Sequence, residues 1–209
     1  MGSGRLITLE GGEGAGKSTQ AGLLAARLAA AGHEVLRTRE PGGTEGAEAI
    51  RELIVHGPPE RWRPLSELYL FLAARDDHLH RAILPALARG TWVVCDRFAD
   101  STRVYQGHAG ALGLAIVDAL QAPLLAGHAP DLTLVLDLPV GLGLARARAR
   151  GEAGRFEAKD SAYHERVREG FRLLAAREPG RVVLIDATGT PEAVAAAVWA
   201  AAKERLELR

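Results

Sequence analysis

Short apolar runs alternate with longer segments of helical character along the chain. The short runs are almost continuously apolar, as expected of strands that are buried on both faces of a sheet. Strands are predicted at residues 5–10, 34–39, 91–96, 132–138 and 181–186. Helices are predicted at residues 17–31, 45–55, 65–88, 98–107, 112–126, 139–150, 160–178 and 191–206. This alternation predicts an α/β fold, with a five-stranded parallel sheet between helices and with ligands at the carboxyl ends of the strands.

A glycine-rich loop joins the first predicted strand to the first predicted helix. It reads Gly-Gly-Glu-Gly-Ala-Gly-Lys-Ser, which is the pattern G-x-x-x-x-G-K-[ST] of a phosphate-binding loop. In such a loop the lysine reaches the β- and γ-phosphates and the Ser hydroxyl suits Mg²⁺. The alternative is a glycine-rich turn that carries Lys-Ser by chance. We expect a nucleoside triphosphate to bind at Gly11, Gly12, Glu13, Gly14, Ala15, Gly16, Lys17, Ser18 and Thr19.

Polar residues stand at the ends of four predicted strands: Glu10, Arg39, Asp96 and Asp137. We expect them to converge on one edge of the sheet, because parallel strands end on the same side. A carboxylate at this position commonly organises a metal ion, so Asp96 and Ser18 are candidate metal ligands. Asp96 also suits the N-cap of the next helix, and the two roles are compatible. Arg39 precedes a Pro-Gly-Gly turn, where it meets an anion or is a plain surface arginine.

Three further polar side chains follow Asp96 at helical spacing. Arg97, Ser101 and Tyr105 are related as i, i+4 and i+8, so on a helix they share one face. That face would carry a guanidinium, a hydroxyl and a phenol, a combination that suits a phosphorylated sugar. The alternative is a solvated helix without a ligand.

Phe71 and Arg75 are also four residues apart. A phenylalanine ring can stack on a base, and an arginine can donate hydrogen bonds in the plane of that base. From the residues alone, the simpler interpretation is preferred, with Phe71 in the core and Arg75 at the surface. His78 is interpreted as a structural histidine rather than a metal ligand.

Residues 151–160 lack an apolar period and contain two glycines. They are interpreted as a charged lid, with its region at about 146–160, in a single domain that spans residues 1–209. Arginines run into this region at positions 146, 148, 150 and 155. Arginines that arrive on lid closure can stabilise transition-state charge, and Arg155 is the favoured one. The alternative is a solvated helix surface.

Composition restricts the range of functions. The 26 basic and 26 acidic residues balance, so there is no overall positive field to attract nucleic acid. The single cysteine, Cys95, lies in an apolar run and is expected to be inert core. There is no signal segment at the start and no apolar stretch of membrane-spanning length. A cytoplasmic protein that binds neither membrane nor nucleic acid is therefore expected.

Taken together, these segments resemble the thymidylate kinases, phosphate-loop NTPases that phosphorylate dTMP with ATP. The resemblance spans residues 5 to about 190. The family-specific segments are Arg39-Glu40-Pro41-Gly42-Gly43-Thr44 and Asp96-Arg97-Phe98, followed by Ser101 and by Tyr105-Gln106-Gly107. Matches are also found at residues 7–19, 70–78, 130–137 and 155–157. The bacterial branch most like this chain has an acid in its phosphate loop, which matches Glu13, and supplies its catalytic arginine from the lid.

The resemblance implies a role for each candidate residue. Phe71 stacks on thymine, Arg75 bonds its edge, and Tyr105 packs under the deoxyribose. Arg39 and Arg97 hold the dTMP phosphate. The complete dTMP set is Glu10, Arg39, Phe71, Arg75, Arg97, Ser101, Tyr105 and Gln106, and Arg146 joins the ATP set. The expected catalytic residues are Lys17, Asp96, Arg97 and Arg155. Gly154 stands where that branch often has Asp, which leaves the choice between Arg155 and Arg150 open.

The resemblance also implies a reaction, a cofactor and an assembly. The ATP γ-phosphoryl group is transferred in line to dTMP, with Mg²⁺, to give dTDP for dTTP synthesis. The acceptor phosphate has its second pKa near 6, so no general base is required. Glu13 and Asp96 both remain candidates for organising the metal. The family forms homodimers. The alternatives are a kinase for another nucleoside or nucleotide, a switch GTPase, and an ATP-binding regulator without turnover.

Overall fold

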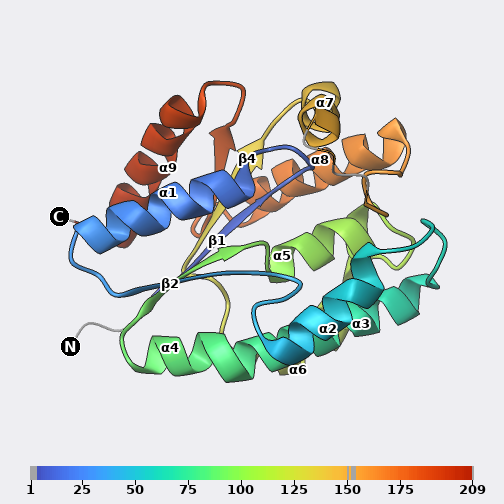
Figure 1. Ribbon diagram of the computed structural model, residues 1–209, viewed down its shortest axis with the longest axis horizontal. Helices are drawn as coiled ribbons and strands as arrows, with labels where there is room; N and C mark the ends of the chain where they lie inside the picture. The colour runs from blue at the N-terminus through green and yellow to red at the C-terminus, as the bar shows by residue number, and fades with distance from the viewer. Residues whose placement is uncertain (1–3, 150, 152–153, 209) are drawn as a thin grey trace.

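A single parallel β-sheet forms the centre of the molecule (Figure 1). The computed structural model describes residues 4–149, 151 and 154–208. The strand order is β2-β3-β1-β4-β5. The strands are β1 Leu6–Gly11, β2 Val35–Arg39, β3 Trp92–Asp96, β4 Leu132–Asp137 and β5 Val182–Asp186. The prediction of five parallel strands is confirmed. The central strands β1 and β4 are buried along almost their whole length and are mostly apolar.

Helices cover both faces of the sheet. On one face, α1 (Lys17–Ala30) and α9 (Pro191–Leu206) pack on the sheet through a shared apolar cluster. On the other face, apolar clusters join the sheet to the helical segments between β2 and β3 and to α8 (Ser161–Arg177). The other α-helices are α2 Glu45–Val55, α3 Pro64–His78, α4 Leu84–Ala88, α5 Ala99–Thr102, α6 Leu114–Leu125 and α7 Val140–Ala149. None of the helices in the described ranges is both long and apolar enough to cross a bilayer.

Two predicted helices are interrupted by π-helical segments. The segment predicted as one helix at 65–88 consists of α3, the π-helical segment η1 (Leu79–Ile83) and α4. Pro85 stands at the start of α4 and lacks the N–H that would continue an α-helical ladder. The helix predicted at 98–107 begins at Ala99 and becomes the π-helical segment η2 (Arg103–His108). Because Arg97 lies before this helix, it cannot share a helical face with Ser101 and Tyr105, and that prediction is wrong.

The register of the strands brings the predicted polar residues to one edge. Asp96 pairs with Leu9 on one side and with Arg39 on the other. Glu10 and Gly11 pair with the last part of β4, next to Asp137. The carboxyl ends of the strands therefore meet where the glycine-rich loop leaves β1, as predicted.

Candidate active site

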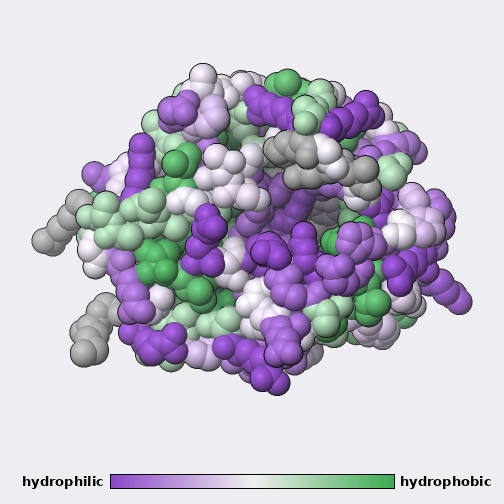
Figure 2. All heavy atoms as spheres, viewed as in Figure 1, coloured by the Kyte–Doolittle hydropathy of each residue, from purple (hydrophilic) through white to green (hydrophobic). Residues whose placement is uncertain are grey.

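A deep cleft opens at the carboxyl edge of the sheet. Its volume is about 680 Å³, within the range of sites that hold small molecules. The cleft is bounded by the glycine-rich loop, the ends of β2 and β3, helices α2 and α3, and residues 154–157. Figure 2 shows that this face of the molecule is hollowed and that hydrophilic side chains surround the hollow. Most of the residues predicted to bind ATP or dTMP line this one space.

The glycine-rich loop has the backbone that a phosphate cradle requires. Gly14 and Gly16 have φ angles of 68° and 90°, in the left-handed region. A Cβ at Gly14 would lie 1.9 Å from the carbonyl oxygen of Gly143, so α7 leaves no room for a side chain there. The first helix begins at Lys17, and its N-terminal N–H groups and positive dipole end face the cleft. The predicted strand–loop–helix context is confirmed.

Lys17 is buried beneath this loop. Its ammonium donates to the carbonyl oxygen of Gly12, at 2.7 Å. Burial, with a smaller effect from nearby Arg97, lowers the pKa of Lys17 from its usual value. A buried lysine with one backbone acceptor keeps two N–H donors for a ligand.

Ser18 and Asp96 meet at the start of α1. The Ser18 hydroxyl donates to Oδ2 of Asp96, so the two predicted metal ligands are adjacent. A hydroxyl and a carboxylate are hard oxygen donors, and Mg²⁺ is commonly held by one or two such groups together with substrate phosphates and water. The residues present therefore fit a divalent cation bound jointly with a polyphosphate. Within the described part of the chain, no group of three His, Cys, Asp or Glu side chains gathers as an all-protein metal site.

Arg97 joins the loop to the segment after β3. Its own backbone has a φ of 68°, and its N–H donates to the carbonyl of Leu9. The guanidinium donates to Ser101 Oγ at 3.1 Å and to Tyr105 Oη at 3.0 Å. Arg97 therefore contacts both Ser101 and Tyr105, but it reaches them from outside the helix and not along a shared helical face as predicted.

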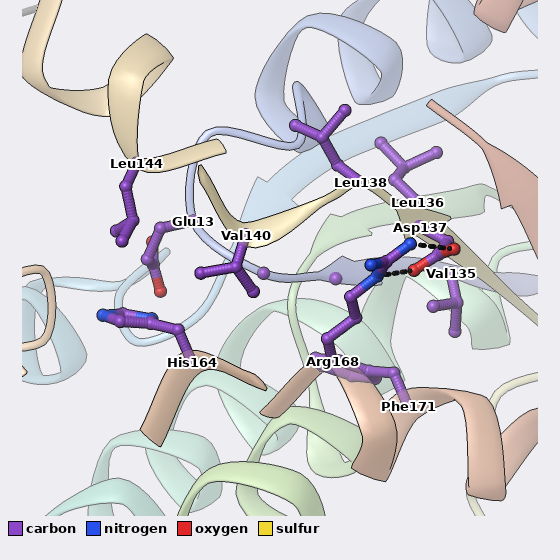
Figure 3. A pocket seen from close by; sticks show the side chains of 12 residues that line it. Glu13, Val135, Leu136, Asp137, Leu138, Val140, Leu144, His164, Arg168 and Phe171 are labelled. Carbon is purple, nitrogen blue, oxygen red and sulfur yellow. Dashed lines mark hydrogen bonds and ion pairs between the residues drawn. The ribbon is translucent and has the colours of Figure 1, made fainter. Parts of the chain in front are cut away.

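Glu13 faces Arg97 across the mouth of the loop. It accepts from the guanidinium at 2.9 Å and from the Tyr105 hydroxyl at 2.7 Å. Burial alone would raise the pKa of Glu13, but Arg97, Lys17 and Tyr105 outweigh it and hold that pKa at about 2. Glu13 is thus a permanent anion that orients Arg97. Figure 3 shows His164 of α8 close to Glu13, and both side chains line a small cavity behind the loop.

Asp137 reaches the same edge but is engaged elsewhere. Its carboxylate accepts two hydrogen bonds from Arg168, at 2.7 and 3.0 Å (Figure 3), and one from Arg172 at 2.8 Å. These contacts tie the end of β4 to α8. Asp137 therefore lines the small cavity, whereas Arg39 and Asp96 are the two strand-end residues that line the main cleft.

Glu10 is a buried carboxylate under the acceptor side of the cleft. It accepts from the backbone N–H groups of Phe98 and Ser101 and, at 2.5 Å, from the Ser101 hydroxyl. Burial, and then the nearby Asp100, raise the pKa of Glu10 to about 7. The carboxylate fixes the backbone turn that presents Arg97 and Ser101.

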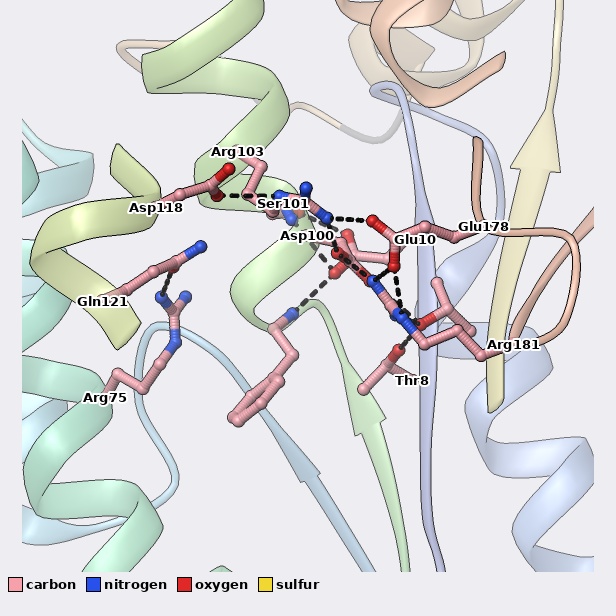
Figure 4. A network of polar contacts seen from close by, with 12 residues as sticks. Thr8, Glu10, Arg75, Asp100, Ser101, Arg103, Asp118, Gln121, Glu178 and Arg181 are labelled. Carbon is pink, nitrogen blue, oxygen red and sulfur yellow. Dashed lines mark hydrogen bonds and ion pairs between the residues drawn. The ribbon is translucent and has the colours of Figure 1, made fainter. Parts of the chain in front are cut away.

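A second buried carboxylate, Asp100, anchors that turn from below (Figure 4). Arg181 donates to both of its oxygens, at 2.7 and 2.9 Å, and Thr133 donates at 3.0 Å. Arg181 also bonds Glu178, which accepts from Arg103 at 2.6 Å. This network links α5 to β4 and to the start of β5, and sequence patterns did not predict it.

Arg75 is buried rather than exposed, so the preferred interpretation from the residues alone was wrong. Its guanidinium is 2% exposed and donates to Glu40 at 2.8 Å, Thr102 at 2.9 Å and Gln121 at 3.2 Å. Phe71 is instead half-buried and lines the cleft. Arg75 can be buried because three polar partners, from three other segments of the chain, satisfy its charge. None of those partners was predicted.

Two other arginines line the cleft on the β2 side. Arg39 is about half exposed and pairs with Glu48 at 2.9 Å. Arg51 of α2 donates to the carbonyl of Pro41 at 2.7 Å. Arg51 was not predicted, because on sequence it is indistinguishable from any solvated helix arginine.

The predicted lid arginines lie in different places. Arg155 is 2% exposed and bonds the backbone carbonyl of Ile54 at the end of α2, that of Pro59 in the following loop, and the carboxylate of Glu67. Arg146 donates to the carbonyl of Ala187 at 3.3 Å, and Arg148 is exposed. Arg150 lies outside the described residues. Glu67, which sequence reasoning missed, also accepts from Gln106 at 2.8 Å.

His78 and Cys95 are structural, as expected. His78 is fully buried and bonds Thr38 at 2.7 Å and Glu40 at 3.1 Å. Burial raises the pKa of the Cys95 thiol well above its usual range, so the thiol stays protonated and unreactive.

Comparisons with known proteins agree with this geometry. A model of the family described as thymidylate kinase matches residues 9–198. A thymidylate kinase of Caulobacter vibrioides is 56% identical over 208 residues, covering 100% of both chains. Another, of Bradyrhizobium diazoefficiens, is 52% identical over 98% of this chain and 91% of its own length. The crystal structure of thymidylate kinase from Ehrlichia chaffeensis aligns with a TM-score of 0.76 and 32% identity, covering 95% of this chain and 98% of that one. The chain belongs to the thymidylate kinase family.

Proposed function

We propose that this protein transfers the γ-phosphoryl group of ATP to dTMP, giving dTDP and ADP in dTTP synthesis. One observation carries the proposal: the phosphate loop and the Arg97–Ser101–Tyr105 group open into the same cleft. A cleft of about 680 Å³ has room for two phosphorylated groups to meet end to end. The family to which the chain belongs supports the same activity.

The donor site is assigned to the loop and to the start of α1. The residues are Gly11, Gly12, Glu13, Gly14, Ala15, Gly16, Lys17, Ser18 and Thr19, together with Arg146 on the adenine side. Left-handed glycines and the N-terminus of a 14-residue helix support binding of a polyphosphate there. Arg146 lies beside the loop after β5, which supports a position near the adenine.

The acceptor site is assigned to the opposite wall of the cleft. Phe71 offers a half-exposed ring, and Arg75 is held rigidly behind it. Arg39 and Arg97 are proposed to share the acceptor phosphate. Ser101 accepts from Arg97 and donates to Glu10, which supports a fixed position of Arg97. Tyr105 and Gln106 close the pocket toward α3. The proposed dTMP set is Glu10, Arg39, Phe71, Arg75, Arg97, Ser101, Tyr105 and Gln106.

A divalent metal ion is implied by the family, and we propose Mg²⁺ at Ser18 and Asp96. Adjacent hard oxygen donors support this choice. Glu13 is committed to Arg97 and Tyr105, which favours Asp96 as the organising acid. The metal, when bound, neutralises charge on the donor phosphates.

The chain's own residues supply position and positive charge. An acceptor phosphate is already anionic near neutral pH, so no side chain must remove a proton. Lys17 and Arg97 both line the cleft, and their positive charge would stabilise the negative charge that spreads over the transferred group. A catalytic role for Arg155 stays a prediction, because each of its guanidinium nitrogens is engaged by other partners.

The assembly and the cellular surroundings are proposed from the family and from the composition of the chain. We propose one nucleotide kinase domain over residues 1–209 with a lid at about 146–160, acting in the cytoplasm as a homodimer and binding no nucleic acid. Exposed apolar side chains on α2, α3 and α6 support a dimer surface: Leu53, Leu65, Tyr69 and Ile116. Equal numbers of acidic and basic residues support the absence of nucleic-acid binding.

A substrate panel tests the proposed specificity. With ATP and Mg²⁺, a coupled ADP-release assay compares dTMP, UMP, CMP and AMP. We expect dTMP to be preferred by at least about a hundredfold in kcat/KM, because a shaped pocket rejects the wrong base and sugar. A preference for another nucleotide would support the alternative, a phosphate-loop kinase with a different acceptor.

A further inference from the structure

Glu67 of α3 stands between residues 154–157, here called the lid, and the acceptor side of the cleft. Its Oε1 accepts from the side-chain amide of Gln106, at 2.8 Å, and its Oε2 accepts from Arg155. The carboxylate is 15% exposed in its ion pair with Arg155. One side chain therefore touches both the lid and a residue that lines the pocket.

The lid is held at this point by Arg155. Its Nε donates to the carbonyl of Ile54 at 2.9 Å and its Nη1 to that of Pro59 at 3.1 Å. Its backbone N–H donates to the carbonyl of Val55 at 3.3 Å. Glu67 is the anion that this guanidinium bonds. Removing one partner of a buried ion pair strongly destabilises the surrounding fold.

The next residue of the lid closes the aromatic part of the cleft. The ring of Phe156 lies 6.1 Å from that of Phe71 and 6.0 Å from that of Tyr105, measured between centroids. The Arg155 guanidinium lies 4.9 Å from the centre of the Phe156 ring. Fixing Arg155 therefore fixes Phe156 over the two rings that line the proposed thymidine pocket.

We infer that Glu67 is a positioning residue that couples dTMP binding to the placement of the lid. Its two oxygens hold Gln106 on the pocket side and Arg155 on the lid side. A ligand that orders the pocket favours the closed lid, and a closed lid favours that ligand by the same factor. The inference deepens the proposed function and rests on its acceptor pocket.

This assignment gives Arg155 a different role from the catalytic one predicted from sequence. A residue that touches the transferred phosphoryl group lowers kcat when it is removed, whereas a residue that places the pocket wall raises the KM for dTMP. The two roles are therefore separable by steady-state kinetics.

The test compares wild type with Glu67→Gln, Arg155→Met and the double variant. We expect each single change to raise the KM for dTMP about tenfold, with kcat and the KM for ATP changed less than about threefold. The double variant should be no worse than the poorer single variant, because both changes break one coupling. Glu60→Gln, an exposed carboxylate on the preceding loop, is the matched control and should match wild type. Additive effects, or a loss confined to kcat, would overturn the inference.

Hydrogen exchange of residues 154–159 gives a readout that needs no turnover. In nucleotide-free protein, Glu67→Gln should speed amide exchange in this segment, and saturating dTMP should protect it less than in wild type. Wild-type exchange in the variant, with and without dTMP, would contradict the coupling.

If Glu67→Gln and Arg155→Met do not fold, Gln106→Leu tests the same coupling. It leaves the Glu67–Arg155 pair in place, so the free lid should exchange as in wild type while saturating dTMP no longer adds protection. Undiminished protection by dTMP would overturn the inference. A wrong assignment of the dTMP pocket is recognised separately. In that case Phe71→Ala would leave the KM for dTMP unchanged.

Discussion

The guanidinium of Arg97 lies 2.9 Å from the carboxylate of Glu13, so the segment after β3 and the phosphate loop are joined by an ion pair across the cleft. Both side chains are largely buried, at 17% and 13% exposure. The pair holds the arginine of the proposed acceptor site against the proposed donor site. If the proposed sites are correct, this contact sets the relative placement of the donor and acceptor phosphates.

Replacing Glu13 by Gln tests this ion pair. We expect kcat/KM for dTMP to fall about tenfold, because a charged hydrogen bond that orients Arg97 is lost. The KM for ATP should not rise, since the change removes negative charge beside the polyphosphate. Steady-state kinetics with each substrate varied in turn measures both, with Glu204→Gln on the exposed face of α9 as control. Unchanged kcat/KM for dTMP would mean that Arg97 needs no such partner.

The metal assignment predicts a loss that depends on Mg²⁺ concentration. Asp96→Asn should lower kcat at least about a hundredfold and raise the Mg²⁺ concentration needed for half activity, because a neutral amide is a poor substitute for a carboxylate ligand. Asp186→Asn is the control, since Asp186 also ends a strand but caps the backbone of Thr188. An activity that responds to Mg²⁺ as wild type does would remove Asp96 from the metal site.

The raised pKa of Glu10 leads to a prediction about how the free energy of unfolding changes with pH. Its folded-state pKa is raised to about 7 from 4.5, so the fold binds its proton more tightly than the unfolded chain. The associated stability is complete below pH 4.5 and is lost as pH rises toward 7. Relative to Glu10→Gln, wild type should lose up to about 3 kcal/mol of unfolding free energy between pH 5 and 8. Urea unfolding at intervals of pH measures this, and parallel curves for the two proteins would contradict the shift.

The network around Asp100 predicts a contrast between buried and exposed pairs. Arg181→Met should lower the unfolding free energy by about 2–3 kcal/mol, because it leaves a buried carboxylate short of its principal partner. Arg5→Met, which breaks the more exposed pair with Asp131, should cost less than about 1 kcal/mol. Chemical denaturation compares the two variants. Equal losses would show that the Asp100 network contributes no more than a surface pair.

Local patterns predicted the fold and the donor loop well, for a physical reason. Strands of a parallel sheet are buried on both faces, so they stand out as apolar runs such as Trp92–Asp96. The loop from Gly11 to Ser18 is contiguous, so its spacing alone specifies it. The π-helical segments could not be predicted, because they span only five and six residues and are too short to show a period of their own.

The burial of Arg75 could not be predicted in the same way. Its partners Glu40, Thr102 and Gln121 come from positions 35 residues before it and 27 and 46 residues after it. Hydrophobic periodicity carries no information about such pairings, so an arginine on a helix is assigned to the surface by default. The contacts of Arg155 with Glu67, with the end of α2 and with the loop that follows α2 could not be predicted for the same reason.

Product analysis by ³¹P NMR tests the central claim most directly. Purified protein is incubated with ATP, Mg²⁺ and dTMP, and the phosphorus resonances of all nucleotides are followed with time. The account predicts that dTDP and ADP appear in equal amounts and that neither forms when dTMP is left out. ADP and inorganic phosphate without dTDP, or no consumption of ATP at all, would contradict it.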